Sequence, residues 1–561
     1  MSEHMTIGDF LLRRLAEVGT GHVFGVPGDY NMSFLEQLLA HRGIEWIGTC
    51  NELNAAYAAD GYARSGRPGV LLTTFGVGCL SALNGVAGAY CEHVPLIHIS
   101  GSPPAHAVAD GVALHHSLLD GGYRNVHRAF EEFTAYAATI STTNAVEVID
   151  HALVTAFRSR RPVRLELPSD LTHVEIPVPT GILDVSDPAP APRQIDDAAA
   201  VVASALMAAT RPLLLFDLPA VRWGALDAIE AFCAALEIPY ACTLPAVHHA
   251  ASADGFLGML PSGRADRQEL FDRADLLITC GLTRSDVTTG GFTLDLDAKH
   301  TVRLGPTSAQ LDTAVYYGTT IGGLLDAVAA QVCDEFEARD RWWKSPAAVP
   351  PAPDPESATL TEKHFFARLQ SFVRPGDVLI AETGTSAQNT VGLPLPDGVR
   401  YVNQSSWGSI GYALPALLGS LIASPDRRHI LCTGDGSFQV TAQELSTILR
   451  HGLTPVVFLL NNRGYTIERS ILGANSAYND VANWAYHELP RVFGGSGAHL
   501  SRICTTPAEL DDALHDAAEA ATLAFIQVEL EPLDMTPATT VVGDATRRFD
   551  YGVYALDNPL R

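Results

Sequence analysis

One pair of polar segments in the sequence has residue types and an order that point to metal and phosphate chemistry. GDGS at 434–437 follows an apolar run at 429–433, and NN at 461–462 follows a second run at 455–460. Glycines let backbone N–H groups approach a phosphate closely, and the start of a helix favours negative charge. Oxygens from Asp435, Asn462 and a main-chain carbonyl, with diphosphate oxygens and water, would satisfy Mg2+. GDG alone would be an ordinary turn, but this order of elements predicts a magnesium-bound diphosphate.

Glu52 is a candidate catalytic acid. It opens an alanine-rich segment, NELNAAYAADGYAR at 51–64, directly after an expected strand at 45–50. A lone glutamate in the first turn of a helix is most commonly a charge that the helix dipole stabilises. In parallel α/β sheets, however, ligands bind at the carboxyl ends of strands, where Glu52 lies. Its position alone leaves both interpretations open.

Four further side chains have the chemistry to move protons near neutral pH. Asp29 follows an expected strand at 22–26, His115 and His116 are adjacent in the segment LHHSL, and Glu468 follows the NN segment. Imidazoles and carboxylates that are held together can relay protons. Each residue alone would be read as an ordinary polar side chain, but the four together favour a relay.

Composition and charge argue against several classes of function. The 561 residues include 63 acidic and 37 basic side chains, for a formal net charge of −26 at pH 7, and 47% of them are apolar. Such a negative surface repels phosphate backbones and anionic lipid, so we expect no nucleic acid and no membrane among the partners. The chain has no basic-then-apolar leader and no apolar stretch of membrane-spanning length. We therefore expect a cytoplasmic protein.

The nine cysteines and a second histidine doublet indicate no further metal or redox site. No two cysteines have C-x-x-C spacing and several lie in apolar runs, so we expect buried free thiols in a reducing compartment. The doublet at 248–249 lies in a loop without an acidic motif, and we interpret it as structural or exposed. Neither doublet has the neighbours of a zinc site.

Two proline-rich stretches, at 186–192 and 345–357, read as linkers. They predict domains at 1–185, 193–345 and 358–540, followed by a C-terminal tail at 541–561. Each block alternates short apolar strands with amphipathic helices, which predicts an α/β fold of three doubly wound parallel sheets. The expected strands are 22–26, 45–50, 70–74, 96–100, 212–216, 275–280, 301–304, 378–381, 429–433, 455–460 and 525–528.

The motifs resemble those of the thiamine-diphosphate-dependent 2-oxo acid decarboxylases, most closely the pyruvate and indolepyruvate decarboxylase family, over nearly the whole chain. The resemblance implies a pyrimidine-binding domain, a middle domain and a diphosphate-binding domain, with thiamine diphosphate and Mg2+ as cofactors. The implied metal ligands are Asp435, Asn462 and the Gly464 carbonyl. The implied cofactor contacts are Glu52, Thr383, Gly408, Ile410, Gly434, Asp435, Gly436, Ser437, Phe438 and Asn462.

The resemblance also implies roles for these side chains. Glu52 activates the cofactor by sharing a proton with its pyrimidine ring. Ile410 bends the cofactor from beneath, and the Gly408 carbonyl orients its amino group. The cofactor then adds to the keto carbon of the substrate and accepts electrons as CO2 leaves, so that an aldehyde is released.

The proton-handling side chains serve the later steps of this reaction. In the family pattern, Glu468 lies near the departing carboxylate and handles protons. Asp29 and His116 act in the steps that release the aldehyde, and His115 supports and orients their network.

The substrate pocket is the least readable part of the resemblance. Ala387, Gln388, Ile467 and Ile471 are the implied lining residues, and Ala387 stands where pyruvate-preferring relatives carry a large aromatic side chain. The extra volume favours an aromatic or branched-chain 2-oxo acid, although Gln388 leaves a polar substrate open and pyruvate remains an alternative. Relatives often close the site with a C-terminal helix, whereas the tail at 541–561 has weak helical periodicity.

The resemblance implies a homodimer at least, because Glu52, Asp29 and the histidine doublet of one subunit meet the magnesium site of another; a homotetramer is common among relatives. Two rival functions stay open. The first is a carboligase of the acetolactate synthase type, which His115, His116 and Glu468 disfavour because they serve aldehyde release. The second is a non-catalytic protein that only binds thiamine diphosphate.

Overall fold

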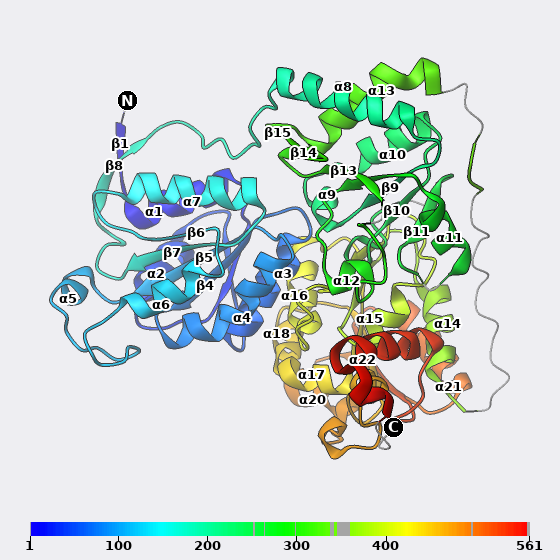
Figure 1. Cartoon of the computed structure of the whole chain (residues 1–561). Coiled ribbons are helices and arrows are strands. Elements are labelled where there is room, and N and C mark those ends of the chain that lie inside the picture. The colour runs from blue at the N-terminus through cyan, green and yellow to red at the C-terminus, as the bar shows by residue number, and fades with distance from the viewer. Residues whose placement is uncertain are drawn as a thin grey trace.

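Three large sheets, one in each third of the chain, form the frame of the protein (Figure 1). The computed structural model describes residues 2–250, 253–262, 264–297, 299–336, 341–344, 359–494 and 497–557. The expected linker at 345–357 and the tail residues 558–561 lie outside the described residues. The expected linker at 186–192 leads directly into helix α8, which begins at Pro192.

The first unit is a six-stranded parallel sheet with helices on both faces. In sheet order its strands are β3 (Glu45–Gly48), β2 (His22–Gly25), β4 (Gly69–Thr74), β5 (Leu96–Ser102), β7 (Val163–Pro168) and β6 (Tyr136–Thr139). Its helices are α1 (Ile7–Glu17), α2 (Met32–Ala40), α3 (Glu52–Ala63), α4 (Val77–Cys91), α5 (Ala105–Ala109), α6 (Arg124–Glu131) and α7 (Ala145–Ser159). A separate antiparallel pair joins β1 (Ser2–Thr6) to β8 (Glu175–Pro179).

The middle unit is a seven-stranded sheet whose last strands run antiparallel. In sheet order its strands are β11 (Phe256–Met259), β10 (Tyr240–Cys242), β9 (Pro212–Phe216), β12 (Leu276–Cys280), β13 (His300–Leu304), β14 (Ser308–Leu311) and β15 (Ala314–Tyr317). Its helical segments are α8 (Pro192–Ala208), α9 (Leu218–Arg222), α10 (Leu226–Ala235), η1 (Leu244–Ala246), α11 (Ala265–Arg273), α12 (Asp286–Thr289) and α13 (Ile321–Phe336).

The third unit is a six-stranded parallel sheet that carries the diphosphate motif. In sheet order its strands are β17 (Arg400–Val402), β16 (Val378–Ala381), β18 (His429–Gly434), β19 (Val456–Asn461), β21 (Leu523–Glu529) and β20 (His499–Cys504). Its helical segments are α14 (Glu362–Phe372), α15 (Thr385–Thr390), α16 (Ala413–Ala423), α17 (Asp435–Thr441), η2 (Ala442–Glu444), α18 (Leu445–Arg450), α19 (Thr466–Ile471), η3 (Ala477–Asn479), η4 (Tyr486–Glu488), α20 (Leu489–Gly494), α21 (Pro507–Glu519) and α22 (Pro537–Asp557).

The α/β fold predicted from the sequence is confirmed, and each expected strand is present with small differences at its ends. The expected parallel sheets are present in all three units, and the middle sheet continues beyond β13 into two antiparallel strands. There β13, β14 and β15 follow one another through very short turns, which can connect only antiparallel neighbours. In the part of the chain that is described, no helix has the length and apolar character needed to cross a bilayer.

The first and third units meet where α3 crosses α16, and glycines set the distance between these helices. A Cβ atom on Gly61 would lie 2.2 Å from the Ala416 carbonyl oxygen, and one on Gly419 would lie 1.8 Å from the Ala58 carbonyl oxygen. Both distances are far below van der Waals contact, so the helices can approach this closely only through glycine. The crossing fixes α3, which begins with Glu52, against the third unit.

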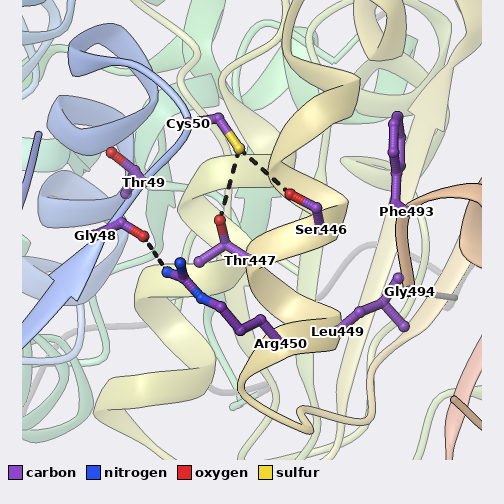
Figure 2. Close-up of a pocket in the computed structure, with 9 residues that line it drawn as sticks. All are labelled: Gly48, Thr49, Cys50, Ser446, Thr447, Leu449, Arg450, Phe493 and Gly494. Atoms are coloured by element: carbon purple, nitrogen blue, oxygen red, sulfur yellow. Dashed lines mark hydrogen bonds between the residues drawn. The ribbon is translucent and has the colours of Figure 1, made fainter.

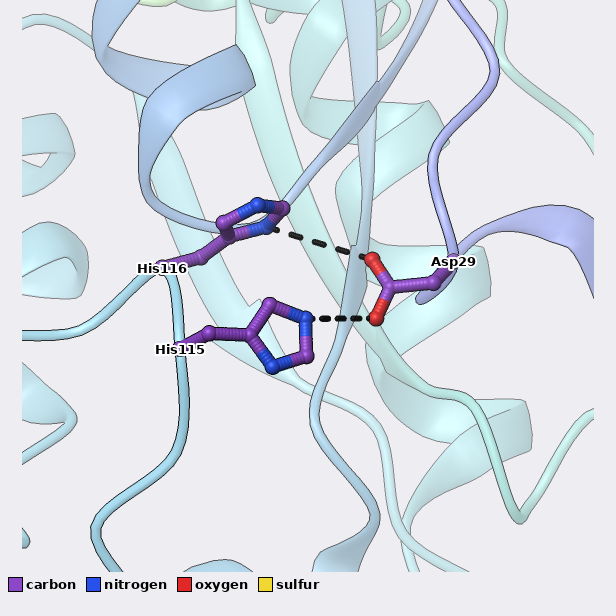
Figure 3. A group of neighbouring side chains, drawn as sticks. All are labelled: Asp29, His115 and His116. Atoms are coloured by element: carbon purple, nitrogen blue, oxygen red, sulfur yellow. Dashed lines mark hydrogen bonds and ion pairs between the residues drawn. The ribbon is translucent and has the colours of Figure 1, made fainter.

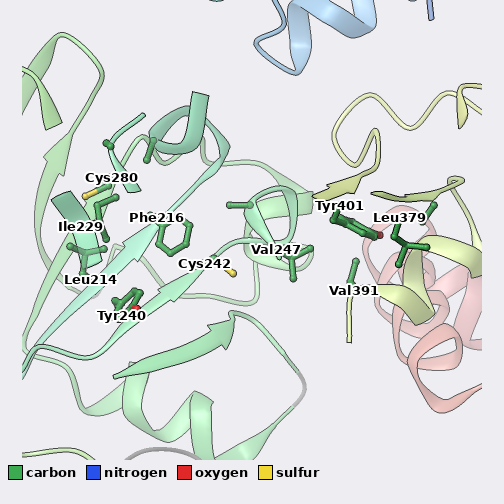
Figure 4. Packing of buried hydrophobic residues seen from close by; sticks show 14 of the residues in the cluster. Leu214, Phe216, Ile229, Tyr240, Cys242, Val247, Cys280, Leu379, Val391 and Tyr401 are labelled. Carbon is green, nitrogen blue, oxygen red and sulfur yellow. The ribbon is translucent and has the colours of Figure 1, made fainter. Parts of the chain in front are cut away.

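The middle and third units share one hydrophobic cluster, which runs from Phe216 and Cys242 through Val247 to Tyr401 (Figure 4). His248 lies at this junction, where its Nε2 is 3.0 Å from the Thr390 carbonyl oxygen. Burial lowers the pKa of His248 to about 4, so the ring is neutral near pH 7. This doublet is therefore structural, as the sequence indicated.

We predict that Gly419→Ala destabilises the protein, because its new methyl group would overlap the Ala58 carbonyl. Overpacking of this kind costs about 1–3 kcal/mol, so the thermal unfolding midpoint should fall by several degrees. Gly181→Ala is the control, since nothing lies within 4 Å of its new Cβ atom. Equal midpoints for both variants would contradict the close helix contact.

Candidate active site

The diphosphate motif lies at the carboxyl edge of the third sheet, as the strand order predicts. β18 ends at Gly434 and α17 begins at Asp435 without an intervening loop. The Asp435 side chain is fully buried. Its Oδ1 accepts the Gly436 N–H at 2.8 Å, and its Oδ2 accepts the Gly464 N–H at 3.0 Å. These bonds fix the carboxylate against the loop that follows the neighbouring strand β19.

Polar groups of three residues converge in a pattern that suits a cation. One end of the Asn462 side-chain amide lies 3.2 Å from Asp435 Oδ1 and 2.7 Å from the Gly464 carbonyl oxygen, and its other end lies 2.9 Å from the Thr466 hydroxyl. In the protein alone the amide nitrogen would donate to both acceptors, whereas a cation held between them would be met by the amide oxygen. Mg2+ holds its oxygens at about 2.1 Å, which places adjacent ligands about 3 Å apart. The oxygens of Asp435, Asn462 and Gly464 therefore fit the metal that the sequence implied.

The surroundings of these oxygens support the same fit. Burial raises the pKa of Asp435 to about 6, a cost to the ionised form that an adjacent cation would offset. Gly464 has a φ of 148°, and a Cβ atom there would lie 2.0 Å from the Asn479 carbonyl oxygen. No other residue fits at this position without moving the backbone.

The first turn of α17 leaves room for a phosphate group. A Cβ atom on Gly436 would lie 2.5 Å from the Tyr465 ring, so only glycine fits there. The N-cap residue is Gly434, and it has no side chain to cap the helix. The Gly436 N–H already donates to Asp435, so the other N–H groups of the first turn are the ones that an anion could meet. Ser437 contributes its N–H and hydroxyl to this turn. The Phe438 side chain is buried in the core, so only its backbone is available to a ligand.

The loop before α16 connects the third unit with α3 and α4. Gly408 has a φ of 65°, a left-handed conformation that favours glycine. The Ser409 hydroxyl lies 2.5 Å from the Tyr57 hydroxyl on α3. Ile410 is 37% exposed, so this apolar side chain faces away from the packed core, as a cofactor-facing residue would.

Glu382 is a buried acid in this region that the sequence analysis did not single out. Its Oε1 accepts the Thr383 N–H at 2.9 Å, and its Oε2 accepts the Ala413 N–H at 3.1 Å. Burial raises its pKa to about 7. Glu382 thereby joins the segment after β16 to the start of α16, and a charged residue directly after an apolar strand was the signal for it.

Asp29, His115 and His116 form one cluster at the edge of the first sheet (Figure 3). His115 Nε2 lies 2.7 Å from Asp29 Oδ2, and His116 Nδ1 lies 3.9 Å from Asp29 Oδ1. Tyr30 stacks on the His115 ring with 5.0 Å between the ring centroids. The structure therefore brings together three of the four predicted relay residues. All three are partly exposed, which leaves them open to a substrate or to another subunit.

Glu52 lies on the same unit as this cluster, since His116 contacts Gly76 and Glu52 contacts Gly78 at the start of α4, whereas Glu468 lies on the third unit. Glu52 begins α3, and its Oε1 lies so close to α4 that a Cβ atom on Gly78 would be 3.0 Å away. Within the described part of the chain its carboxylate makes no hydrogen bond. Glu468 is exposed on α19 in the third unit. A single chain thus presents the predicted catalytic residues on separate units.

A pocket of about 240 Å3 lies between the third unit, the middle unit and α22. Two of the implied substrate-pocket residues, Ala387 and Gln388, line it, together with Thr383. The implied wall residues Ile467 and Ile471 are not part of its lining. The other lining residues are Leu244, Asp286, Val287, Gly290, Gly291, Gly384, Val391, Asn403, Gln404, Ser405, Val542, Ala545, Thr546, Phe549 and Asp550.

The interpretation of the tail as weakly helical is wrong. Residues 537–557 form α22, with a kink at Gly552, and its side chains cover the pocket. Arg547 donates to the carbonyl oxygen of Ile471 at 2.6 Å, and Phe549 packs on Phe292 of the middle unit with 5.3 Å between ring centroids. These tertiary contacts hold a helix whose own apolar pattern is weak.

Glu362 anchors the segment that leads into α22. Its Oε2 accepts the Thr536 N–H at 3.1 Å, and its own N–H donates to Asp534. The Thr536 hydroxyl in turn donates to Asn389 on α15, which lines one side of the pocket. Burial raises the pKa of Glu362 to about 7, so its neutral form is favoured in the folded protein.

The expectation of buried thiols is wrong at Cys50, which is exposed, and Cys91 is only partly buried. Cys79, Cys233, Cys242, Cys280, Cys432 and Cys504 are buried, and the Cys333 side chain lies outside the described residues. Burial raises the pKa of the Cys242 and Cys504 thiols to about 12, so these side chains are inert.

Comparison with known proteins identifies the same three units. Residues 5–129 match the thiamine pyrophosphate enzyme N-terminal TPP binding domain, residues 199–331 its central domain, and residues 383–528 its C-terminal TPP binding domain. The alpha-keto-acid decarboxylase of Mycolicibacterium paratuberculosis is 38% identical over 517 residues, which cover 91% of both chains. The alpha-keto-acid decarboxylase of Mycobacterium leprae is 37% identical over 571 aligned residues, with 99% of this chain and 98% of that protein covered.

We predict that Glu362 makes the stability of the protein fall as the pH rises. Its unfolded pKa lies near 4.5 and its folded pKa near 7, so the stabilisation is complete below pH 4.5 and is lost as the pH rises to about 7. Glu362→Gln lacks this titration. The thermal midpoint of the variant minus that of the wild type should therefore increase from pH 5 to pH 8. The control Glu509→Gln removes an exposed cap whose pKa is lowered, and it should show no such rise. A constant offset for Glu362→Gln would contradict the buried neutral acid.

Proposed function

The chain belongs to the alpha-keto-acid decarboxylases of the thiamine pyrophosphate enzyme family, and we propose that it converts an aromatic or branched-chain 2-oxo acid to an aldehyde and CO2. Its relatives over more than nine-tenths of the chain are alpha-keto-acid decarboxylases. The observation that carries the proposal is the convergence of the Asp435 carboxylate, the Asn462 amide and the Gly464 carbonyl beside the first turn of α17, which no side chain caps from Gly434. That arrangement suits a diphosphate held through a divalent cation.

Asp435, Asn462 and the Gly464 carbonyl are the proposed Mg2+ ligands, and the first turn of α17 is the proposed diphosphate site. Bound thiamine diphosphate supplies a nucleophilic carbon and an electron sink. The loop with Gly408 and Ile410 is proposed to lie beneath the two rings. Its placement against α3 through Ser409 and Tyr57 supports a rigid platform for them.

Glu52 is the proposed activating acid, and it holds a proton at N1′ of the pyrimidine. The cluster of Asp29, His115 and His116 is proposed to deliver and remove protons as the aldehyde forms and leaves. The 2.7 Å contact between Asp29 and His115 supports a fixed relay, because the carboxylate orients the ring. Glu468 is proposed to handle the proton near the departing carboxylate.

A homodimer is the smallest assembly that would complete this site. Glu52 and the Asp29 cluster lie on the first unit, whereas the proposed metal ligands and Glu468 lie on the third. Exposed apolar side chains flank the first-unit residues: Val77 and Leu80 on α4 beside Glu52, and Leu118 and Leu119 after His116. Large exposed apolar side chains of this kind are typical of protein interfaces. A homotetramer, as is common in the family, remains part of the proposal.

The pocket beside α22 supports the choice of a larger substrate. Its volume of about 240 Å3 is lined by the small side chains of Thr383, Gly384 and Ala387 and by apolar groups of α22. Gln388 adds one amide to this wall, which a polar substituent would meet. Pyruvate is the alternative substrate, and a smaller wall residue alone discriminates by only about 1–3 kcal/mol.

A carboligase of the acetolactate synthase type is the competing reaction, and product analysis separates the two. Free aldehyde as the main product supports the decarboxylase. A hydroxyketone or an acetohydroxy acid as the main product would overturn it. Thiamine diphosphate binding without CO2 release from any 2-oxo acid would instead favour a protein that only binds the cofactor.

We predict that Glu52→Gln binds thiamine diphosphate and Mg2+ with affinity close to wild type but loses nearly all turnover. An amide cannot supply the proton at N1′, and loss of a positioned acid commonly costs about 100-fold or more. CO2 release measures turnover, and calorimetry with and without Mg2+ measures binding. Turnover near wild type in this variant would remove Glu52 from the reaction.

We predict that Ala387→Phe shifts the preference toward pyruvate, because the new ring would occupy the pocket. CO2 release over pyruvate, branched, phenyl and indole 2-oxo acids gives kcat/KM for each substrate. The ratio of aromatic to pyruvate kcat/KM should fall at least about tenfold relative to wild type. Gly392→Ala is the control, since its new methyl group meets nothing within 4 Å. An unchanged ratio would show that the pocket does not select the substrate.

A further inference from the structure

We propose that Glu444 is a positioning residue for Glu52, an inference that rests on the catalytic role proposed above for Glu52. Glu444 lies at the end of η2, directly before α18 in the third unit. Its carboxylate reaches across the domain junction to the segment that carries Glu52. In this role, Glu444 fixes the orientation of the Glu52 side chain.

Glu444 holds the chain on both sides of Glu52. Its Oε2 accepts the Cys50 N–H at 3.2 Å and the side-chain N–H of Asn54 at 2.7 Å. Cys50 comes two residues before Glu52, and Asn54 comes two residues after it. Asn51 completes the turn, since its Oδ1 accepts the Asn54 N–H at 2.8 Å. One carboxylate oxygen therefore ties the end of β3 to the first turn of α3.

The burial of the Glu444 carboxylate lowers the stability of the folded protein. The residue is 0% exposed, and its Oε1 has no hydrogen-bond partner. Across the described residues, no cationic side chain forms an ion pair with it. A buried polar atom without a partner costs about 1–3 kcal/mol, and more when it is charged. Packing alone would be served better by an apolar side chain, so the carboxylate is retained for its contacts with the Glu52 segment.

Packing does not hold this segment from its other side. An open cavity of about 420 Å3 lies between the end of β3 and α18, and Figure 2 shows Cys50 and Gly48 facing Ser446, Thr447 and Arg450 across it. Cys50 is exposed, and its thiol lies 3.3 Å from the Gln443 carbonyl oxygen and 3.4 and 3.8 Å from the Ser446 and Thr447 hydroxyls. Arg450 donates to the Gly48 carbonyl at this cavity, so the hydrogen bonds to Glu444 are the buried part of the connection between this turn and the third unit.

The test is the rate at which the C2 hydrogen of bound thiamine diphosphate exchanges with deuterium, followed by acid quench and NMR. This rate reports activation by Glu52 without substrate turnover. Glu444→Ala should slow the exchange about 10- to 100-fold, because a displacement of about 1 Å costs this much. Calorimetric affinity for the cofactor should change little. Glu444→Gln keeps an acceptor oxygen and should restore part of the rate, and Asn54→Ala should lose part of it.

Asp217→Asn is the matched control. Asp217 is also a buried carboxylate that accepts backbone N–H groups, from Leu218 at 2.7 Å and Thr283 at 3.0 Å, but it lies in the middle unit. Its variant should lose thermal stability and keep the wild-type exchange rate. Equal slowing in Asp217→Asn would mean general loosening and would overturn the proposal.

The outcomes separate this inference from the proposed function. The positioning role is overturned, and the proposed function is kept, if exchange is slow in Glu52→Gln but has the wild-type rate in all three of Glu444→Gln, Glu444→Ala and Asn54→Ala. Fast exchange in Glu52→Gln overturns both. If Glu444→Ala does not fold, the test uses Glu444→Gln and Asn54→Ala. Slowed exchange in both variants supports the proposal. Wild-type exchange in both overturns it.

Discussion

The close contact between α3 and α16 is the constraint on which the rest of the site depends. Gly61 and Gly419 let the two helices meet backbone to backbone. α3 starts at Glu52, and α16 follows the loop of Gly408 and Ile410. A single helix crossing therefore sets the position of the proposed acid and of the proposed cofactor platform. Because backbone contact leaves little room to slide, both are held more rigidly than side-chain packing alone would allow.

Three buried acids near the edge of the third sheet share the same arrangement, in which a carboxylate accepts backbone N–H groups. Asp435, Glu382 and Glu444 each sit almost without exposure, and each accepts backbone N–H groups from segments distant in sequence. Burial raises the pKa of Asp435 to about 6 and of Glu382 to about 7, so these acids cost stability that the apolar strands must offset. Burial of the apolar strands therefore stabilises the fold, and the loops that follow the strands hold the buried carboxylates at the site.

Features set by local sequence could be predicted, and features set by distant contacts could not. The strands and the motif around Asp435 follow from apolar runs and glycines, so the sequence alone revealed them. α22 was not predicted because contacts with residues distant in sequence stabilise it, such as the hydrogen bond from Arg547 to the Ile471 carbonyl. The apolar strand before Glu382 places this residue at the edge of the sheet, but no residue near Glu382 or Glu444 in the sequence indicates the distant N–H groups that the two carboxylates accept.

The separation of the catalytic groups over two units gives Glu444 its significance. Glu52 lies on the first unit, but the carboxylate that brackets its turn belongs to the third unit of the same chain. In the proposed dimer, Glu52 would serve the cofactor of the partner. The same third unit that binds one cofactor would then aim the acid that acts on the other. η2 and α18 follow α17 directly in the chain, with a non-helical residue, Thr441, at the junction, so Glu444 and the proposed diphosphate site lie on consecutive segments of one unit.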